Sequence, residues 1–341
     1  MEFLAELGVF SGKVIVLSAA TGVLLILFFG LLMRARQTKQ LLSVENLNER
    51  YNDMSEALKE TIYDAKALKA DGKEAKKRAK AEKKHPRDKK RLFVLDFMGD
   101  IRAAHVDNLR EEISAILTIG RRETDEVVLR LESPGGMAHA YGLAAAQLLR
   151  VKDAGLKLTI SIDKVAASGG YMMACTADRI LAAPFAIVGS IGVVAQVPNF
   201  HRLLKKHDVD FEEITAGEFK RTVSLFGEIT DKGRRKFLDQ LEDTHALFKS
   251  FVKSCRPKLD LDQVATGEYW FGKRAMELNL VDEIISSDDY LFRQRETADI
   301  YKIEIQIRKK WSEKLAENIA SLAVRSLEKT WSKSAESRFP G

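Results

Sequence analysis

The chain has 341 residues, of which 45% are hydrophobic and 30% charged, with 21 Gly and 6 Pro. This balance predicts about two folded regions and excludes collagen-like, mucin-like and wholly disordered proteins. The net charge of +6 is local, because residues 69–91 carry 12 Lys/Arg against 4 Asp/Glu and the remainder of the chain carries −2. A nucleic-acid-binding surface is therefore not indicated. Cys175 and Cys255 allow at most one disulfide, and no Cys/His cluster has zinc-site spacing, so we expect neither a metal nor a cofactor.

The first predicted element is a membrane anchor within residues 1–36. Residues 14–33 contain no charge, and a helix of that length spans about 30 Å, the thickness of a bilayer core. A cleaved signal peptide is the competing interpretation, but its apolar region is usually about 7–15 residues and ends at small residues. This run ends in Leu31, Leu32 and Met33, so we expect an uncleaved, single-pass anchor. More basic residues lie after the run than before it, which favours a cytoplasmic location for the rest of the chain.

Residues 37–90 are predicted to form a helical and basic linker. Their apolar side chains recur at steps of three and four, at Leu47, Tyr51, Met54, Leu58, Ile62, Ala65 and Leu68. This spacing indicates a helix that either forms a short coiled coil or packs on the folded body. The basic residues after it are typical of a solvated linker or of a segment that binds anionic lipid headgroups.

A folded domain is expected from residue 91. Apolar runs predict strands at 92–97, 127–132, 158–162 and 180–183, and helical periodicity between them predicts helices at 106–119, 138–152 and 170–177. Strands that alternate with helices predict parallel βαβ units with right-handed crossovers. The apolar stretch 185–197 is too short to span a bilayer, and we expect it in the core.

Two further elements are predicted near the C-terminus. Residues 231–255 have the pattern of a long amphipathic helix, in which His245 is expected to pack rather than bind a ligand. Residues 291–341 are expected to form a strand, with apolar residues alternating from 301 to 307, and then an amphipathic helix. That last helix could pack on the body, on a neighbouring subunit or on a lipid surface.

Three short segments each combine glycines with one reactive side chain or a sharp turn. Residues 133–136 (SPGG) come after a predicted strand and present backbone N–H groups at its carboxyl end, although a plain loop would have the same sequence. Ser168, in AASGGY, opens a helix whose dipole favours developing negative charge; a simple N-cap serine is the alternative. Lys220, in AGEFKR, can serve a serine nucleophile as its base when it is neutral, whereas a surface lysine is the ordinary interpretation.

Together these segments resemble the signal peptide peptidase family of membrane-bound Ser/Lys peptidases, in particular its single-copy, membrane-anchored branch. The resemblance extends to residues 188–194 (VGSIGVV) and 217–230 (GEFKRTVSLFGEIT). It also includes residues 265–284, where Asn279 stands at a position at which Gly is common in the family. It covers about residues 91–290, which we expect to form the peptidase domain.

The resemblance implies a fold, an assembly and a set of site residues. The fold is α/β, a Clp/crotonase-like spiral of βαβ units preceded by one transmembrane helix. Ser168 is implied as nucleophile, Lys220 as general base, the N–H groups of Gly136 and Gly169 as oxyanion hole, and the Ser190 hydroxyl as the group that orients the lysine. Family members assemble into rings whose subunits can share the dyad, so a homo-oligomer is expected.

The resemblance also implies substrates and a location. Peptides or unfolded proteins, such as signal-peptide remnants and other short apolar peptides, are the expected substrates, and the bacterial inner membrane is the expected location. The resemblance favours a periplasmic peptidase domain, in conflict with the flanking charges. Two alternatives stay open: an acyl-CoA hydratase or isomerase of the crotonase type on the same fold, and a catalytically idle membrane scaffold.

Overall fold

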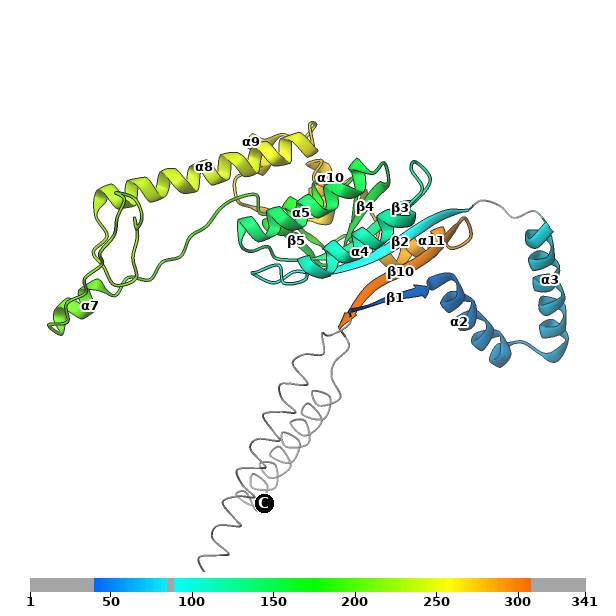
Figure 1. Ribbon diagram of the computed structural model, residues 1–341. Helices are drawn as coiled ribbons and strands as arrows, with labels where there is room; N and C mark the ends of the chain where they lie inside the picture. Colours follow the sequence, from blue (N-terminus) through cyan, green and yellow to red (C-terminus); the bar gives the residue numbers. More distant parts are fainter. Residues whose placement is uncertain (1–39, 85–88, 308–341) are drawn as a thin grey trace, which may run out of the picture. The chain divides into compact units, whose positions relative to one another are not determined.

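The computed structural model describes residues 40–84 and 89–307, which are built around a seven-stranded sheet (Figure 1). In spatial order its strands are β1 (Gln40–Asn46), β10 (Ala298–Ile307), β2 (Lys90–Met98), β3 (Glu126–Glu132), β4 (Lys157–Ile162), β6 (Arg179–Ala182) and β9 (Glu283–Ile284). The pairings from β10 across to β9 are parallel. A smaller sheet joins β5 (Val165–Ala167) to β7 (Ile187–Gly189) in parallel, and β7 to β8 (Tyr269–Phe271) antiparallel.

The larger sheet is buried on both faces along β2, β3 and β4, which explains why these strands are nearly continuous apolar runs. Along β2, Phe93, Leu95 and Phe97 belong to one core cluster, whereas Leu92 and Val94 belong to the other. The first cluster includes side chains of α4 (Val106–Ile119) and α5 (Ala138–Asp153), and the second includes side chains of α11 (Ser287–Gln294). Figure 1 shows α4 and α5 next to each other, running alongside the strands.

The predicted alternation of strands and helices is confirmed, and the α/β class with it. Each predicted strand agrees with an observed one to within a few residues, and α4 has the predicted bounds. The helix after Ser168, α6 (Gly169–Ala174), ends earlier than predicted, and the long amphipathic helix is α8 (Asp231–Cys255). The other helices of the described chain are α2 (Leu47–Ile62), α3 (Ala65–Lys84), α7 (His201–Lys206), α9 (Leu261–Val264) and α10 (Gly272–Glu277).

The sheet extends beyond the segment that was expected to begin at residue 91. Strand β10 lies between β1 and β2. The Asn48 side chain ties the start of α2 to β10: its amide donates to the Arg295 and Ala298 carbonyls at 2.8 and 3.0 Å, and its oxygen accepts from the Ile300 N–H at 2.7 Å. Further along α2, the apolar side chains of Met54, Leu58 and Ile62 are exposed. The helix therefore packs on the body near its start only.

Two predicted elements lie outside the described residues: the anchor at 14–33 and the C-terminal amphipathic helix after residue 307. Within residues 40–84 and 89–307, no helix is both long enough and apolar enough to cross a bilayer.

The prediction that residues 185–197 belong to the core is wrong for Phe185, which is 81% exposed, and for residues 193–197. Val188 and Ile191 are fully buried, but Val194 is 82% exposed. The chain leaves the small sheet at Ser190, which has φ 52°. From residue 192 to residue 247 no side chain is buried.

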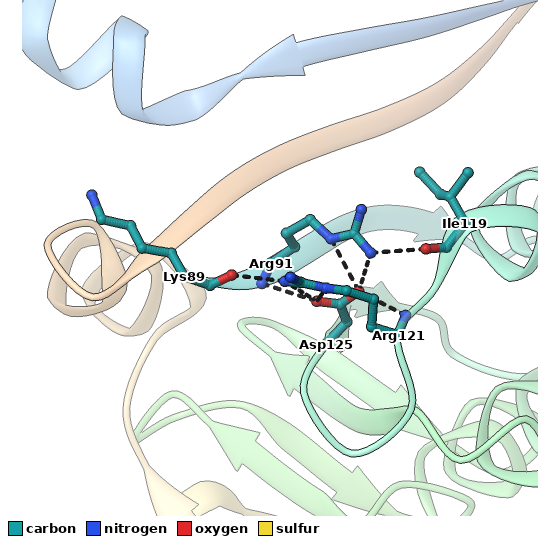
Figure 2. Close-up of polar contacts among 5 residues, drawn as sticks. All are labelled: Lys89, Arg91, Ile119, Arg121 and Asp125. Atoms are coloured by element: carbon teal, nitrogen blue, oxygen red, sulfur yellow. Dashed lines mark hydrogen bonds and ion pairs between the residues drawn. The ribbon is translucent and has the colours of Figure 1, made fainter. Parts of the chain in front are cut away.

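A carboxylate immediately before β3 anchors the end of the larger sheet at which β2 and β3 begin (Figure 2). The Asp125 side chain is 0% exposed and accepts hydrogen bonds from the guanidinium groups of Arg91 and Arg121. Arg91 also donates to the Ile119 carbonyl at 2.8 Å, and Arg121 to the Lys89 carbonyl at 2.7 Å. Burial by itself raises the pKa of Asp125, but the hydrogen bonds from the two arginines outweigh it and lower that pKa to about 2.

Candidate active site

Three of the glycine-containing segments lie side by side at the carboxyl ends of strands. The Ser133 N–H donates to the Val165 carbonyl at 2.8 Å, and the Ala167 N–H donates back to the Ser133 carbonyl at 3.0 Å. On the other side of β5, Ala167 pairs with Gly189 of β7, and the Ser168 N–H donates to the Gly189 carbonyl at 2.8 Å. Residues 133–136, 166–171 and 188–190 therefore form one continuous backbone layer.

Ser168 has a backbone conformation that is rare for a residue with a side chain. Its φ of 51° and ψ of −117° differ from the extended conformation of an N-cap, and its hydroxyl makes no capping hydrogen bond to α6. Ser168 therefore precedes α6 without capping it through its side chain. Non-glycine residues held in such regions cluster at functional sites, where the surrounding structure must maintain them.

Close backbone packing around Ser168 explains why its neighbours are glycines. Gly135 has φ +92°, and a Cβ there would lie 2.8 Å from the Ser168 Cβ. A Cβ on Gly136 would lie 2.2 Å from the Ile101 carbonyl oxygen, and one on Gly169 would lie 2.4 Å from the Tyr141 ring. Gly169 is the first residue of α6, so its N–H is one of those that a helix leaves without an internal partner. Such N–H groups carry partial positive charge and bind anions.

Ser168, Gly136 and Gly169 line a common cavity of about 520 Å³. His139 and Thr244 contribute polar groups to it. Most of the remaining lining is apolar and comes from α5, α6, the loop after β7 and α8, namely Met137, Met172, Val193, Val194, Leu247, Phe248 and Phe251. Pockets that bind small molecules or peptides typically combine apolar walls with a few converging polar groups.

The two remaining predicted residues differ in position. Ser190 is next to Gly189, which accepts the Ser168 N–H, and its own N–H donates to the Glu268 carbonyl at 2.6 Å. Ser190 is therefore brought alongside Ser168. Lys220 lies in the loop between α7 and α8, where it is exposed and its N–H donates to the Gly217 carbonyl at 3.1 Å. Lys220 is not one of the described residues that line the cavity of Ser168.

Tyr141 lies behind these segments and was not predicted from the sequence. Its side chain is fully buried, and its hydroxyl is 2.6 Å from the Ser133 hydroxyl and donates to the Asp100 carbonyl at 2.7 Å. The only signal in the sequence is a tyrosine one turn into a helix, a pattern shared by ordinary core aromatics.

Asn279 has φ 61°, in the left-handed region that Gly and Asn adopt most readily. This accounts for an asparagine at a position where the family commonly has glycine. Cys175 and Cys255 are free thiols. Within the part of the chain that the structure describes, no group of three or more His, Cys, Asp or Glu is arranged to hold a metal ion.

Comparison with known proteins gives two adjoining family matches, "Peptidase family S49 N-terminal" over residues 2–148 and "Peptidase family S49" over residues 150–301. The probable protease SohB of Haemophilus influenzae is 47% identical over 335 residues, which cover 91% of this chain and 93% of that protein. The chain belongs to peptidase family S49. The resemblance to the signal peptide peptidases is thereby confirmed.

Other matches to this S49 peptidase are more distant or shorter. The probable protease SohB of Buchnera aphidicola subsp. Acyrthosiphon pisum is 55% identical over 232 residues, covering 68% of this chain and 69% of that protein. Protease 4 of H. influenzae is 28% identical over 229 residues, covering 63% and 37%. A solved membrane-bound stomatin-specific protease with a substrate peptide has a TM-score of 0.42 and 12% identity, covering 69% of this chain and 99% of that one.

Membership of a serine peptidase family confirms the predicted peptide hydrolase. It also decides between the peptidase and the acyl-CoA enzyme, both of which the sequence motifs allowed, in favour of the peptidase.

Proposed function

We propose that this S49 peptidase is a membrane-bound endopeptidase that uses Ser168 and Lys220 as a catalytic dyad and cleaves short apolar peptides, including signal-peptide remnants. The observation that carries the proposal is the position of Ser168. It is held in a strained conformation beside the helix N-terminus of α6, at an apolar cavity that it shares with Gly136 and Gly169.

Each group has a distinct step in the proposed reaction. The Ser168 Oγ attacks the peptide carbonyl while Lys220 takes its proton, and Lys220 then returns that proton to the leaving amine. The N–H groups of Gly136 and Gly169 stabilise the negative charge that develops on the carbonyl oxygen. Water subsequently hydrolyses the acyl-enzyme, with Lys220 again as base. Ser190, beside Ser168, is suited to orient the lysine.

We further propose that Lys220 acts on the Ser168 of a second copy of the chain. A lysine in water is protonated at neutral pH and cannot accept a proton until burial favours its neutral form. Lys220 is exposed in the single chain, within a segment without buried side chains that also exposes Val209, Phe211 and Ile214. Packing against a second copy would cover this segment, and the expected homo-oligomer provides that copy.

The cavity supports the proposed substrate class. Its walls are formed mainly by Met, Val, Leu and Phe side chains, which favour large apolar residues near the cleaved bond. The charge-free run at residues 14–33 supports a location at the bacterial inner membrane, close to a supply of apolar peptides.

The full chain, purified in detergent, should be tested on a synthetic signal peptide and on an unfolded protein. Wild type should cleave both, and S168A and K220A should each lose about 10³-fold or more of the activity. Lys157→Ala, which removes an exposed lysine at the start of β4, serves as the matched control and should cleave normally. If wild type, S168A and K220A all cleave equally while folded, the dyad is wrong. If folded wild type cleaves neither substrate, the result favours the scaffold interpretation.

A further inference from the structure

Tyr141 contacts Gly169 directly and reaches the segments on either side of Gly136 through hydrogen bonds. It lies in the first turn of α5, and its side chain is 0% exposed. Its contacts run in three directions: through its ring to Gly169, and through its hydroxyl to the turn at Ser133 and to the loop at Asp100.

The hydroxyl of Tyr141 is the central link of a hydrogen-bonded chain. Because it donates its proton to the Asp100 carbonyl at 2.7 Å, it accepts from the Ser133 hydroxyl at 2.6 Å. Ser133 Oγ in turn accepts from the Gly135 N–H at 3.1 Å. The chain therefore fixes the turn that immediately precedes Gly136.

The same hydroxyl also fixes the opposite side of Gly136. The carbonyl of Ile101, the residue after Asp100, accepts the Met137 N–H at 2.8 Å and lies against Gly136. The pair of hydroxyls is closed off from solvent by Gly99, where even a Cβ would lie 2.4 Å from both oxygens. Ser133 is 0% exposed, so water has no access to replace a lost hydroxyl.

The ring of Tyr141 supports the second N–H donor. A Cβ on Gly169 would lie 2.4 Å from the Tyr141 Cγ and 2.7 Å from its Cδ2. The backbone at the start of α6 therefore rests directly on the aromatic ring, which sets how far Gly169 can withdraw from the cavity.

We propose that Tyr141 is the positioning residue of the oxyanion hole, which holds the N–H groups of Gly136 and Gly169 at the spacing that the developing oxyanion requires; this inference rests on the proposed function. Tyr141 touches no substrate, since it is absent from the cavity lining within the described chain. It acts through the two glycines. Donors of this kind lose much of their effect when they are displaced by a fraction of an ångström.

The test is Tyr141→Phe in the full, detergent-purified chain, because phenylalanine keeps the ring and removes only the hydroxyl. We expect kcat to fall roughly 10- to 100-fold with KM nearly unchanged, because the donors lose their alignment while the apolar cavity stays intact. A peptide boronate, whose tetrahedral adduct places an oxygen in the oxyanion hole, should lose affinity by a similar factor.

The matched control is Tyr290→Phe, which removes another buried tyrosine hydroxyl. It donates to Glu126 Oε1 at 2.7 Å within the other core cluster. This variant should lose stability and retain kcat. Ser133→Ala removes the hydroxyl that bonds to Tyr141 and should reproduce the loss in kcat. The double variant should lose little more kcat than either single variant, because both changes break the same hydrogen-bonded chain.

If Y141F folds, either of two results would overturn the positioning role. One is wild-type kcat and boronate affinity in folded Y141F; the other is a loss in Y141F that only tracks the fraction of unfolded protein, as in Y290F. If neither Y141F nor S133A folds, the hydroxyl pair serves the fold and the positioning role is rejected. S168A in the same assay separates the two proposals, since cleavage that survives in S168A refutes the proposed function itself.

Discussion

At the scale of single residues, Ser168 combines its hydroxyl with a backbone conformation that a Cβ disfavours. A φ of 51° with ψ of −117° is accessible to glycine at little cost, whereas other residues lose about 1–3 kcal/mol there. The hydrogen bond to Gly189 and the packing of Gly135 hold the chain in place. Glycine, which has no nucleophilic side chain, would therefore fit this backbone better than serine does.

This strain gives a prediction on stability. Ser168→Gly should be about 1 kcal/mol more stable than Ser168→Ala, because glycine relieves the strain by more than it adds freedom to the unfolded chain. Denaturant unfolding of the two inactive variants measures the difference. At Ser114, within α4, the order should be reversed, since glycine is the poorer residue in a helix. Equal stability of the two Ser168 variants would contradict the strain.

Asp125 gives a prediction on acid stability. Its pKa is about 2 in the folded protein, below the ordinary value near 3.8, so its stabilising effect is complete above about pH 4 and is lost as the pH falls towards 2. The loss amounts to about 2 kcal/mol. Urea unfolding should give a difference in the free energy of unfolding between wild type and Asp125→Asn that is about 1.5 kcal/mol smaller at pH 2.5 than at pH 6, with the remainder lost below pH 2. If this difference does not change with pH, the pKa of Asp125 is the same in the folded and the unfolded protein.

At the scale of secondary-structure elements, α8 divides into two parts. Near its C-terminal end Phe248 and Val252 are buried in the core, and Leu247 and Phe251 beside them line the cavity of Ser168. The earlier part of the helix contributes no buried side chain. One helix thus links the core to the wall of the cavity.

Leu247 offers a way to change specificity without disturbing the fold, since it is 64% exposed. Leu247→Glu should lower kcat/KM for a peptide with leucine near the cleaved bond by roughly 10-fold or more, because a carboxylate replaces part of an apolar wall. A peptide with lysine at that position should be cleaved better than by wild type. Leu58→Glu, on α2 and 62% exposed, is the control. If kcat/KM falls equally for both peptides, Leu247 has no role in substrate specificity.

The elements also show what a sequence can predict. The strands β2, β3 and β4 were predictable because a parallel strand covered on both faces must be a continuous apolar run. Strands β5, β8 and β9 have three residues or fewer, which is too short for any periodicity, and they exist because neighbouring strands provide partners. Strand β1 (QLLSVEN) is an edge strand whose pairing is settled by β10, more than two hundred residues away.

At the scale of the whole molecule, the order of motifs along the chain predicted which residues to examine but not where they lie. Residues 133–136, 166–171 and 188–190 become neighbours because Ser133, at the end of β3, bridges to β5 and β5 pairs with β7. These short pairings have no signature in the sequence. Lys220 is in a loop between α7 and α8. No local sequence pattern predicts whether a lysine in such a loop contributes to the active site of its own chain or of another. Tyr141 was not predicted because its role depends on contacts with segments 8 to 41 residues away.

A mixing experiment tests the proposed exchange of Lys220 between copies. S168A and K220A should each be inactive alone, but co-assembly should pair an intact Ser168 with an intact Lys220. About a quarter of the sites should then be active in an equal, random mixture, provided the dyad forms between subunits. Activity should appear only after the subunits exchange. If the mixture stays inactive after its subunits have exchanged completely, Ser168 and Lys220 of each active site come from the same chain.

The position of β10 has a consequence for biosynthesis. Asn48 cannot form its hydrogen bond to Ala298 until that residue, 250 residues further along the chain, has been synthesised. In the same way, β1 and β2 are joined only through β10. At about 5–20 residues per second, translation leaves these strands with open edges for roughly 10 to 50 s. During this interval the open edges of the nascent chain are available for pairing with other chains. A message truncated before codon 298 would yield a product that never closes its sheet, however complete its catalytic segments.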